Sequence, residues 1–159
     1  MTASTRTTTT IAELPSLKGQ ELGTSDWFEV TQERVDTFAD ATGDHQWIHV
    51  DVERAKAESP FGGPIAHGFL TLSLLVPLVS QTYTVTDAAM GVNYGLNKVR
   101  FPAPLRVGSR IRMHVVVAEV KDISGPGGSG AEAVYRLTYE VEGETKPCCV
   151  ADLVFRYYA

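Results

Sequence analysis

The sequence lacks any stretch that is rich in lysine and arginine. Its 14 basic residues are outnumbered by 19 acidic residues, so the net charge is −5 near neutral pH. A nucleic-acid backbone attracts a basic surface, and this charge balance therefore excludes non-specific binding to DNA or RNA. Apolar residues make up 43% of the 159 residues, which is ordinary for a soluble globular protein with one core. We expect one domain and no nucleic-acid partner.

Long apolar runs are also missing. The longest, residues 69–79, is about half of a membrane span and contains Thr71, Ser73 and Pro77, which favours a buried core helix. Residues 1–10 hold one arginine and no apolar run, so they do not resemble a secretory signal. We expect a flexible tail over residues 1–15 and one domain over residues 16–159, with neither export nor membrane binding.

Cysteine is scarce. Only Cys148 and Cys149 occur, side by side in a segment that alternates like a strand, so their side chains should point to opposite faces. We interpret them as packing residues rather than as a redox pair. This usage predicts a reducing, cytoplasmic compartment.

Helix signals dominate the first half of the chain. Thr31 can cap a helix that Gly43 ends, because glycine tolerates the left-handed conformation of a helix stop. Asp51 can cap a second, short helix, which must end before Pro60 because proline disfavours helix in the residue ahead of it.

A third helix is predicted over residues 69–81, after a Gly/Pro-rich turn at residues 60–68. It is apolar on nearly every side, so it should be buried all round. Pro77 should bend it or loosen one turn, because its ring blocks a helical hydrogen bond.

The period of the pattern changes to two after Asn93. Apolar and polar residues alternate over 111–117, 133–141 and 149–157, as in strands with one buried face. The glycine-rich residues 124–130 are expected to form a flexible connection between neighbouring antiparallel strands. Long antiparallel strands and one buried helix predict an α+β fold in which the sheet curls around the helix.

Three motifs resemble one protein family. In order, they are TGDHQWIHVD at residues 42–51, SPFGGPIAHGFLTLSLL at 59–75 and KVRFPAPLRVGSRI at 98–111. Together they closely resemble the MaoC-like (R)-specific enoyl-CoA hydratases and dehydratases, and the resemblance extends from about Ser25 to the end of the chain. It implies a single hotdog fold, with a five-stranded antiparallel sheet wrapped around a long central helix.

The resemblance implies an activity. Such enzymes add water reversibly to trans-2-enoyl-CoA and give (R)-3-hydroxyacyl-CoA, without a cofactor. Two alternatives stay open: a 3-hydroxyacyl thioester dehydratase subunit that acts on acyl carrier protein, and a non-catalytic hotdog subunit that binds acyl thioesters. The second alternative is less favoured because a pure scaffold could lose either of the two expected catalytic residues, and both are intact.

The hydratase motif of the family identifies the two expected catalytic residues. It runs Gly-Asp-x-Asn-Pro-aliphatic-His, and this chain matches it at Gly43, Asp44, Ile48 and His49. It departs from the motif where the family has Asn and Pro. At these two positions, which border the acyl or pantetheine path in such enzymes, this chain carries Gln46 and Trp47.

Hydration chemistry fits Asp44 and His49. Water addition needs a base for the water, an acid for the α-carbon and a group that stabilises charge on the thioester oxygen. The two residues are five apart across a helix-to-loop junction, so a bend could bring both to one water, with Trp47 and Ile48 excluding other water. We predict that His49 activates the water, that Asp44 shares it, and that the proton returns to the α-carbon from the same face. Without the other two motifs, the favoured explanations would be structural: a loop carboxylate that bonds nearby backbone for Asp44, and a core histidine with satisfied hydrogen bonds for His49.

The second motif supplies the supporting residues. In the family, a backbone amide near the start of the central helix holds the thioester oxygen, and Ile65, His67 and Gly68 fall there in this chain. We predict substrate binding by Ile65 and His67, and a supporting role for Gly68, although tight helix packing explains this glycine equally well. Ser73 matches a supporting serine of the family, but it could instead bond a carbonyl of its own helix.

Two rival chemistries fit less well. His45 and His49 beside Asp44 could mimic a metal site, but Gly43 ends the helix that would align them and no third ligand is near, so no metal is predicted. Hotdog thioesterases often place a catalytic carboxylate on the central helix. The sequence has no carboxylate between Glu58 and Asp87, which disfavours that mechanism.

The resemblance also predicts the partners. Family members form dimers with the substrate tunnel between the subunits, so we expect a homodimer that binds an acyl-CoA thioester. The edge of a short sheet needs covering, which agrees with this expectation. Lys98, Arg100 and Arg106 are candidates for the CoA phosphates, although a solvated strand face would also explain them.

Overall fold

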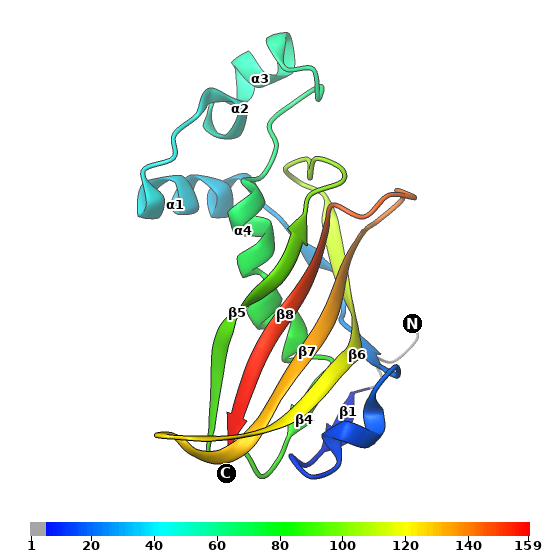
Figure 1. Ribbon diagram of the computed structural model, residues 1–159. Helices are drawn as coiled ribbons and strands as arrows, with labels where there is room; N and C mark the ends of the chain where they lie inside the picture. The colour runs from blue at the N-terminus through cyan, green and yellow to red at the C-terminus, as the bar shows by residue number, and fades with distance from the viewer. Residues whose placement is uncertain (1–5) are drawn as a thin grey trace.

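A curved antiparallel sheet forms the body of the protein (Figure 1). The computed structural model describes residues 6–159. The strands follow the order β2-β6-β7-β8-β5, and the short β3 also pairs with β6. Their bounds are β2 (Glu21–Thr24), β3 (Phe28–Glu29), β5 (Met90–Arg100), β6 (Arg110–Gly125), β7 (Gly128–Val141) and β8 (Cys149–Tyr158). The predicted α+β fold with a five-stranded antiparallel path is confirmed, with β3 as a short addition.

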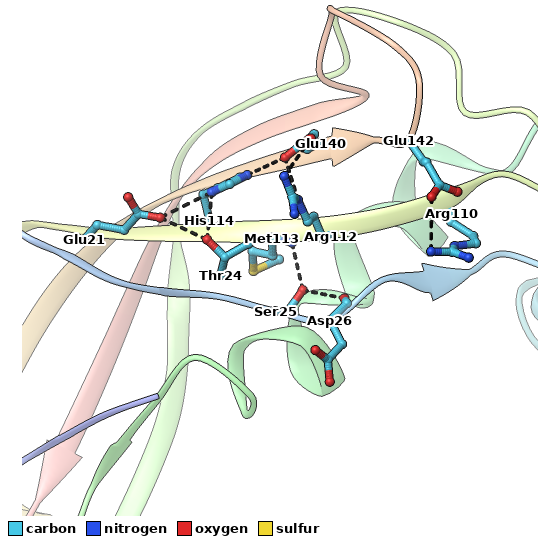
Figure 2. A network of polar contacts seen from close by, with 10 residues as sticks. All are labelled: Glu21, Thr24, Ser25, Asp26, Arg110, Arg112, Met113, His114, Glu140 and Glu142. Atoms are coloured by element: carbon cyan, nitrogen blue, oxygen red, sulfur yellow. Dashed lines mark hydrogen bonds and ion pairs between the residues drawn. The ribbon is translucent and has the colours of Figure 1, made fainter. Parts of the chain in front are cut away.

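The alternating pattern of the strands separates a buried face from a polar face. On β7, Tyr135, Leu137 and Tyr139 are fully buried against the helix side. On the opposite face, Arg112 forms a two-pronged pair with Glu140 at 2.7 and 3.0 Å. Figure 2 shows that this pair belongs to a network of polar contacts between neighbouring strands. The core therefore lies on the helix side only.

The central helix is interrupted. It consists of α4 (Gly68–Ser73) and α5 (Leu75–Val79), which meet at Leu74. Pro77 lacks an N–H group and cannot bond the carbonyl four residues earlier, so the predicted loosened turn is confirmed. The prediction that the helix is buried all round is wrong for the single chain. Phe69 is 74% exposed and Val76 is 67% exposed, because the sheet covers only one side of the helix.

Three helices gather at one end of the sheet, beside the start of α4 (Figure 1). They are α1 (Gln32–Thr42), α2 (Trp47–Val50) and α3 (Val52–Glu58). The predicted signals act as expected: the Thr31 hydroxyl caps α1, Gly43 ends it with a φ of 79°, and the Asp51 carboxylate caps α3. The single turn of α2 was not predicted, and it supplies the bend between Asp44 and His49.

Residues 7–15 form regular structure and contribute to the core. Strand β1 (Thr7–Thr9) pairs in parallel with β4 (Tyr83–Val85), and the short helix η1 (Leu14–Leu17) follows. Leu14 is fully buried. The prediction of a flexible tail is therefore wrong for residues 7–15, because strand pairing satisfies the polar threonines and the core takes up the leucine. Residues 1–5 lie outside the described residues.

The glycine-rich segment 124–130 joins neighbouring antiparallel strands as predicted, but most of it is paired. Ser124 lies opposite Ser129, and Gly125 lies opposite Gly128 in the ladder between β6 and β7. Only Pro126 and a glycine are left to make the turn. The expected flexible connection is thus a tight hairpin.

Both cysteines pack in the core. Cys148 and Cys149 are buried and free, and burial raises the pKa of each thiol to about 12, which suits packing rather than redox chemistry. The cytoplasmic location stays a prediction. Within residues 6–159, none of the helices is long and apolar enough to cross a bilayer.

Candidate active site

His49 is held in one tautomer by the backbone. It lies in the last turn of α2 and is only 7% exposed. Its Nδ1 lies 2.6 Å from the carbonyl oxygen of Ile65. A carbonyl oxygen can only accept a hydrogen bond, so Nδ1 carries the proton and Nε2 of the neutral ring keeps its lone pair. This tautomer makes His49 a base at Nε2.

The environment of His49 favours the neutral ring. Burial lowers the pKa of His49 and the neighbouring His67 lowers it further, while the Ile65 carbonyl and the Asp44 charge act in the opposite direction. The net shift is downward. The imidazole is therefore unprotonated near neutral pH, as a general base must be.

Asp44 reaches the same space from the loop between α1 and α2. One of its carboxylate oxygens and one ring nitrogen of each of His49 and His67 lie within 4.8 Å of one another. Two polar atoms at such a separation can share one water, because each hydrogen bond to the water spans about 2.8 Å. The predicted proximity of Asp44 and His49 is thus confirmed, and the arrangement can transfer protons to and from a water.

His67 lies against this pair. It precedes α4 and is only 3% exposed. Its Nε2 donates to the backbone carbonyl of Asp44 at 2.9 Å. Its ring stacks on His49 with centroids 3.9 Å apart and an interplanar angle of 27°. The ring of Phe38 contacts it at a centroid distance of 4.9 Å, a contact that the sequence pattern did not predict because α1 and α4 are far apart in the chain.

His67 is a third potential metal ligand beside Asp44 and His49, which the sequence analysis did not count because it lies far along the chain. The absence of a metal stays a prediction. His45 lies elsewhere: it contacts Asp40 at 2.8 Å, and this contact raises the pKa of His45.

Two backbone amides of the turn before α4 already have hydrogen-bond partners. The amide of Ile65 donates to Ile48 at 3.0 Å and that of Ala66 donates to Leu105 at 2.8 Å. The later amides, of His67 and Gly68, remain as candidates for holding a thioester oxygen, because the first amides of a helix have no partner within it. The carbonyl of Ile65 holds His49, which is a positioning role that the sequence analysis did not predict.

Gly68 also has a packing role. A Cβ atom at this residue would lie 3.1 Å from the ring of Phe101, which is tight for a carbon contact. The glycine therefore lets the aromatic ring approach the helix. The packing explanation and the supporting role are compatible at this position.

The remaining predicted residues have other contacts. The backbone of Gln46 begins α2, and its amide approaches the Asp44 carboxylate at 3.4 Å. The Trp47 ring lies under the Arg54 guanidinium, 4.3 Å from its central carbon. Ser73 donates to the Leu70 carbonyl of its own helix at 2.8 Å, the alternative that its sequence allowed. Substrate binding by Gln46 and Trp47 and support by Ser73 stay predictions.

A groove lies along α1, with Leu70 of α4 on its other side. Its volume is about 450 Å³. The lining residues are Thr31, Glu33, Arg34, Thr37, Phe38, Ala41 and Leu70. Phe38 separates the groove from the histidines, because its ring contacts that of His67 and neither His49 nor His67 lines the groove.

A curved sheet around a central helix, with a carboxylate and a neutral imidazole within 4.8 Å of each other, defines a hotdog-fold protein with a candidate acid–base site. Comparison with known proteins identifies the family. The family model of the MaoC like domain matches residues 13–134, and the chain belongs to this family. The resemblance found in the three sequence motifs is confirmed.

Individual relatives agree with this assignment. A protein of Mycobacterium tuberculosis (strain CDC 1551 / Oshkosh) named 3-hydroxyacyl-thioester dehydratase Z is 53% identical over 154 residues, covering 97% of this chain and 99% of the relative. The structure of R-hydratase PhaJ1 from Pseudomonas aeruginosa superposes with a TM-score of 0.68 at 18% identity, covering 89% of this chain and 81% of that chain. The C-terminally truncated HadBC (3R-hydroxyacyl-ACP dehydratase) complex from M. tuberculosis superposes with a TM-score of 0.60 at 16% identity. The match covers 88% of this chain and 96% of that chain. The two structural likenesses confirm the fold.

Proposed function

We propose that the protein is a hydro-lyase that adds water reversibly to a trans-2-enoyl-CoA and gives the (R)-3-hydroxyacyl-CoA. One observation carries this proposal: the tautomer of His49 leaves a lone pair at Nε2, and a ring nitrogen of His49 lies within 4.8 Å of a carboxylate oxygen of Asp44, close enough for both residues to contact one water. Membership of the MaoC like domain family and the 53% identity to a named 3-hydroxyacyl-thioester dehydratase support it.

The proposed hydration moves one proton through the site. Nε2 of His49 takes a proton from the water while Asp44 accepts a hydrogen bond from its other hydrogen. The water oxygen forms its bond to the β-carbon, and the electron pair of the double bond moves toward the thioester oxygen. An amide at the start of α4, at Gly68, stabilises the charge that gathers there. The α-carbon then takes the proton back from the site, so His49 and Asp44 return to their first state.

An enzyme assay tests the proposal. Loss of the enoyl absorbance of crotonyl-CoA reports turnover, and an (R)-specific dehydrogenase reports the configuration of the product. Removing the base in His49→Ala, or the carboxylate charge in Asp44→Asn, should lower kcat by roughly 10²–10⁴-fold while circular dichroism shows a folded protein. His45→Ala is the matched control, because its imidazole lies on the same loop but is exposed and contacts Asp40. Wild-type rates in either dyad variant would exclude this mechanism.

The carrier is a separate question. The alternative is a dehydratase subunit for acyl carrier protein, which would turn over crotonyl carrier protein but not crotonyl-CoA. The non-catalytic alternative predicts binding of an acyl thioester without turnover of either. Parallel assays with both thioesters distinguish the enzyme that acts on CoA esters, the subunit that acts on acyl carrier protein and the non-catalytic subunit.

We propose that the chain forms a homodimer through β5 and the exposed side of the central helix. Strand β5 is an edge of the sheet, paired only with β8 among the described strands. All exposed large apolar side chains of residues 6–159 lie on α4, α5, β5 or directly after it: Phe69, Val76, Met90, Tyr94, Leu96 and Phe101. Such residues favour burial by a second chain. Light scattering at micromolar concentration should give twice the chain mass. A monomer would contradict the proposal, and dimer formation only with an unlike subunit would replace it.

A further inference from the structure

His67 has an unusual hydrogen-bonding state. It is 3% exposed, and its Nδ1 has no hydrogen-bond partner within residues 6–159. A buried polar atom without a partner destabilises the folded state, because it has lost its hydrogen bond to water. Folded proteins retain few such atoms, and each calls for an explanation. Simple core packing does not explain why a histidine occupies this position.

The two contacts of His67 reach both members of the proposed dyad. Its Nε2 donates to the backbone carbonyl of Asp44 at 2.9 Å, which ties the loop after α1 to the start of α4. Its ring face lies on His49 with centroids 3.9 Å apart. One side chain therefore holds the carboxylate residue through its backbone and the imidazole through its ring.

These contacts also fix the tautomer of His67. The bond to a carbonyl places a proton of His67 on Nε2, and its Nδ1 is left without a hydrogen-bond partner. The electrostatic neighbours of His49 are His67 and the carboxylate of Asp44, and Phe38 on α1 adds an uncharged ring on His67. The two rings therefore form one packed unit beside the carboxylate.

We propose that His67 is a positioning residue that holds His49 as a neutral base and Asp44 beside it, so that both side chains face one water. This inference rests on the proposed function and deepens it, because it assigns one task to the N–H group of His67 and another to the face of its ring. It replaces the substrate-binding role predicted from the sequence. The lowered pKa of His49, caused first by burial and then by His67, agrees with it.

Two variants separate the two tasks. His67→Phe keeps a ring against His49 but removes the N–H group that holds the Asp44 carbonyl. His67→Gln keeps an N–H donor but removes the ring. His45→Gln serves as the control, since this exposed histidine of the same loop hydrogen-bonds Asp40 and has no hydrogen bond or ring contact with His49.

The first measurement needs no substrate. Nitrogen-15 NMR of the histidine rings reports the tautomer and the titration midpoint of His49. In the wild type we expect the Nδ1–H tautomer and a midpoint below that of free histidine. Both His67 variants should raise this midpoint, and His67→Gln should raise it more because the ring that shields His49 from water is lost. The control should leave it unchanged.

The second measurement is the pH profile of hydration. The acidic limb of kcat/KM should move to higher pH in both variants, because His49 then becomes protonated more readily. His67→Phe should show the larger fall in kcat, roughly 10²-fold with little change in KM, because a displaced Asp44 no longer shares the water. A purely structural role for His67 would lower thermal stability without moving the acidic limb.

An unchanged midpoint of His49 in folded His67→Gln would overturn the inference, and so would an unchanged acidic limb in folded His67→Phe. His49 in the Nε2–H tautomer in the wild type would instead contradict the base assigned under the proposed function, because the Ile65 carbonyl fixes that tautomer. If the wild type turns over no enoyl thioester, the proposed function fails, while the NMR result still shows whether His67 sets the state of His49.

Discussion

Replacing Gly130 by alanine should destabilise the protein through a backbone collision. Gly130 lies on β7, opposite Tyr158 of β8. A Cβ atom at this position would overlap the carbonyl oxygen of Tyr157 and lie 2.9 Å from its carbonyl carbon and 3.1 Å from the α-carbon of Tyr158. All three atoms belong to the backbone, so no side-chain rotation can relieve the contact. Strand β8 must move away from β7.

The size of the effect follows from the cost of such a shift. Overpacking that displaces backbone costs typically about 1–3 kcal/mol, and we expect the upper end here. A domain of this size loses about 2–4 °C of melting temperature per kcal/mol, so Gly130→Ala should melt roughly 6–12 °C below the wild type. The loss is a large fraction of a total stability of about 5–15 kcal/mol.

Gly125→Ala is the matched control. Gly125 lies in the same hairpin, and a Cβ atom there would meet nothing within 4 Å. Its melting temperature should stay near that of the wild type, because substitutions at open surface positions usually change stability by no more than about 0.5 kcal/mol. Thermal unfolding followed by circular dichroism at one protein concentration makes the comparison. Equal melting temperatures for the two variants would refute the reasoning about strand packing at Gly130.

Two further predictions concern polar contacts of the sheet. The Tyr139 hydroxyl donates to the Leu72 carbonyl of α4 at 2.9 Å. Tyr139→Phe should therefore lower the free energy of unfolding, measured by chemical denaturation, by about 1–2 kcal/mol. An unchanged free energy of unfolding would show that water replaces the bond. In the network of Figure 2, Arg112 and then His114 hold the pKa of Glu140 below its ordinary value of 4.5. The stabilisation that the charged Glu140 gives to the folded state is present above pH 4.5 and is lost as pH falls through the folded-state pKa. Arg112→Gln should therefore lower the free energy of unfolding near neutral pH, and lower it much less in acid. An equal loss at both pH values would contradict the electrostatic explanation.

The local features of the fold follow from the sequence. The Thr31 cap, the Gly43 stop and the alternation of the long strands depend on residues a few positions apart, so the pattern alone predicts them. The pairing of Asp44 with His49 belongs to this group, because five residues and one bend suffice to join them. The loosened turn near Pro77 is likewise a local consequence of a missing N–H group.

The features that decide the state of the site come from contacts between distant parts of the chain. His49 owes its tautomer to the carbonyl of Ile65, 16 residues away, and Asp44 is tied to His67 across 23 residues. The position of the Phe101 ring over Gly68 joins β5 to the central helix. No periodicity encodes these meetings, because they depend on how the turn before α4 folds back over α2.

The same reason explains two of the predictions that the structure corrects. The polar residues of the N-terminal segment indicate a tail when read locally, but β4 supplies a pairing partner for β1 that lies far along the chain. The central helix is apolar all round, yet the single chain has only one sheet to cover it, so Phe69 and Val76 remain exposed. The sequence by itself predicted the capped helix α1, the long strands, the family and the proximity of Asp44 and His49. Only the tertiary structure decided which nitrogen of His49 keeps its lone pair and which side of the central helix remains uncovered, because both depend on long-range packing.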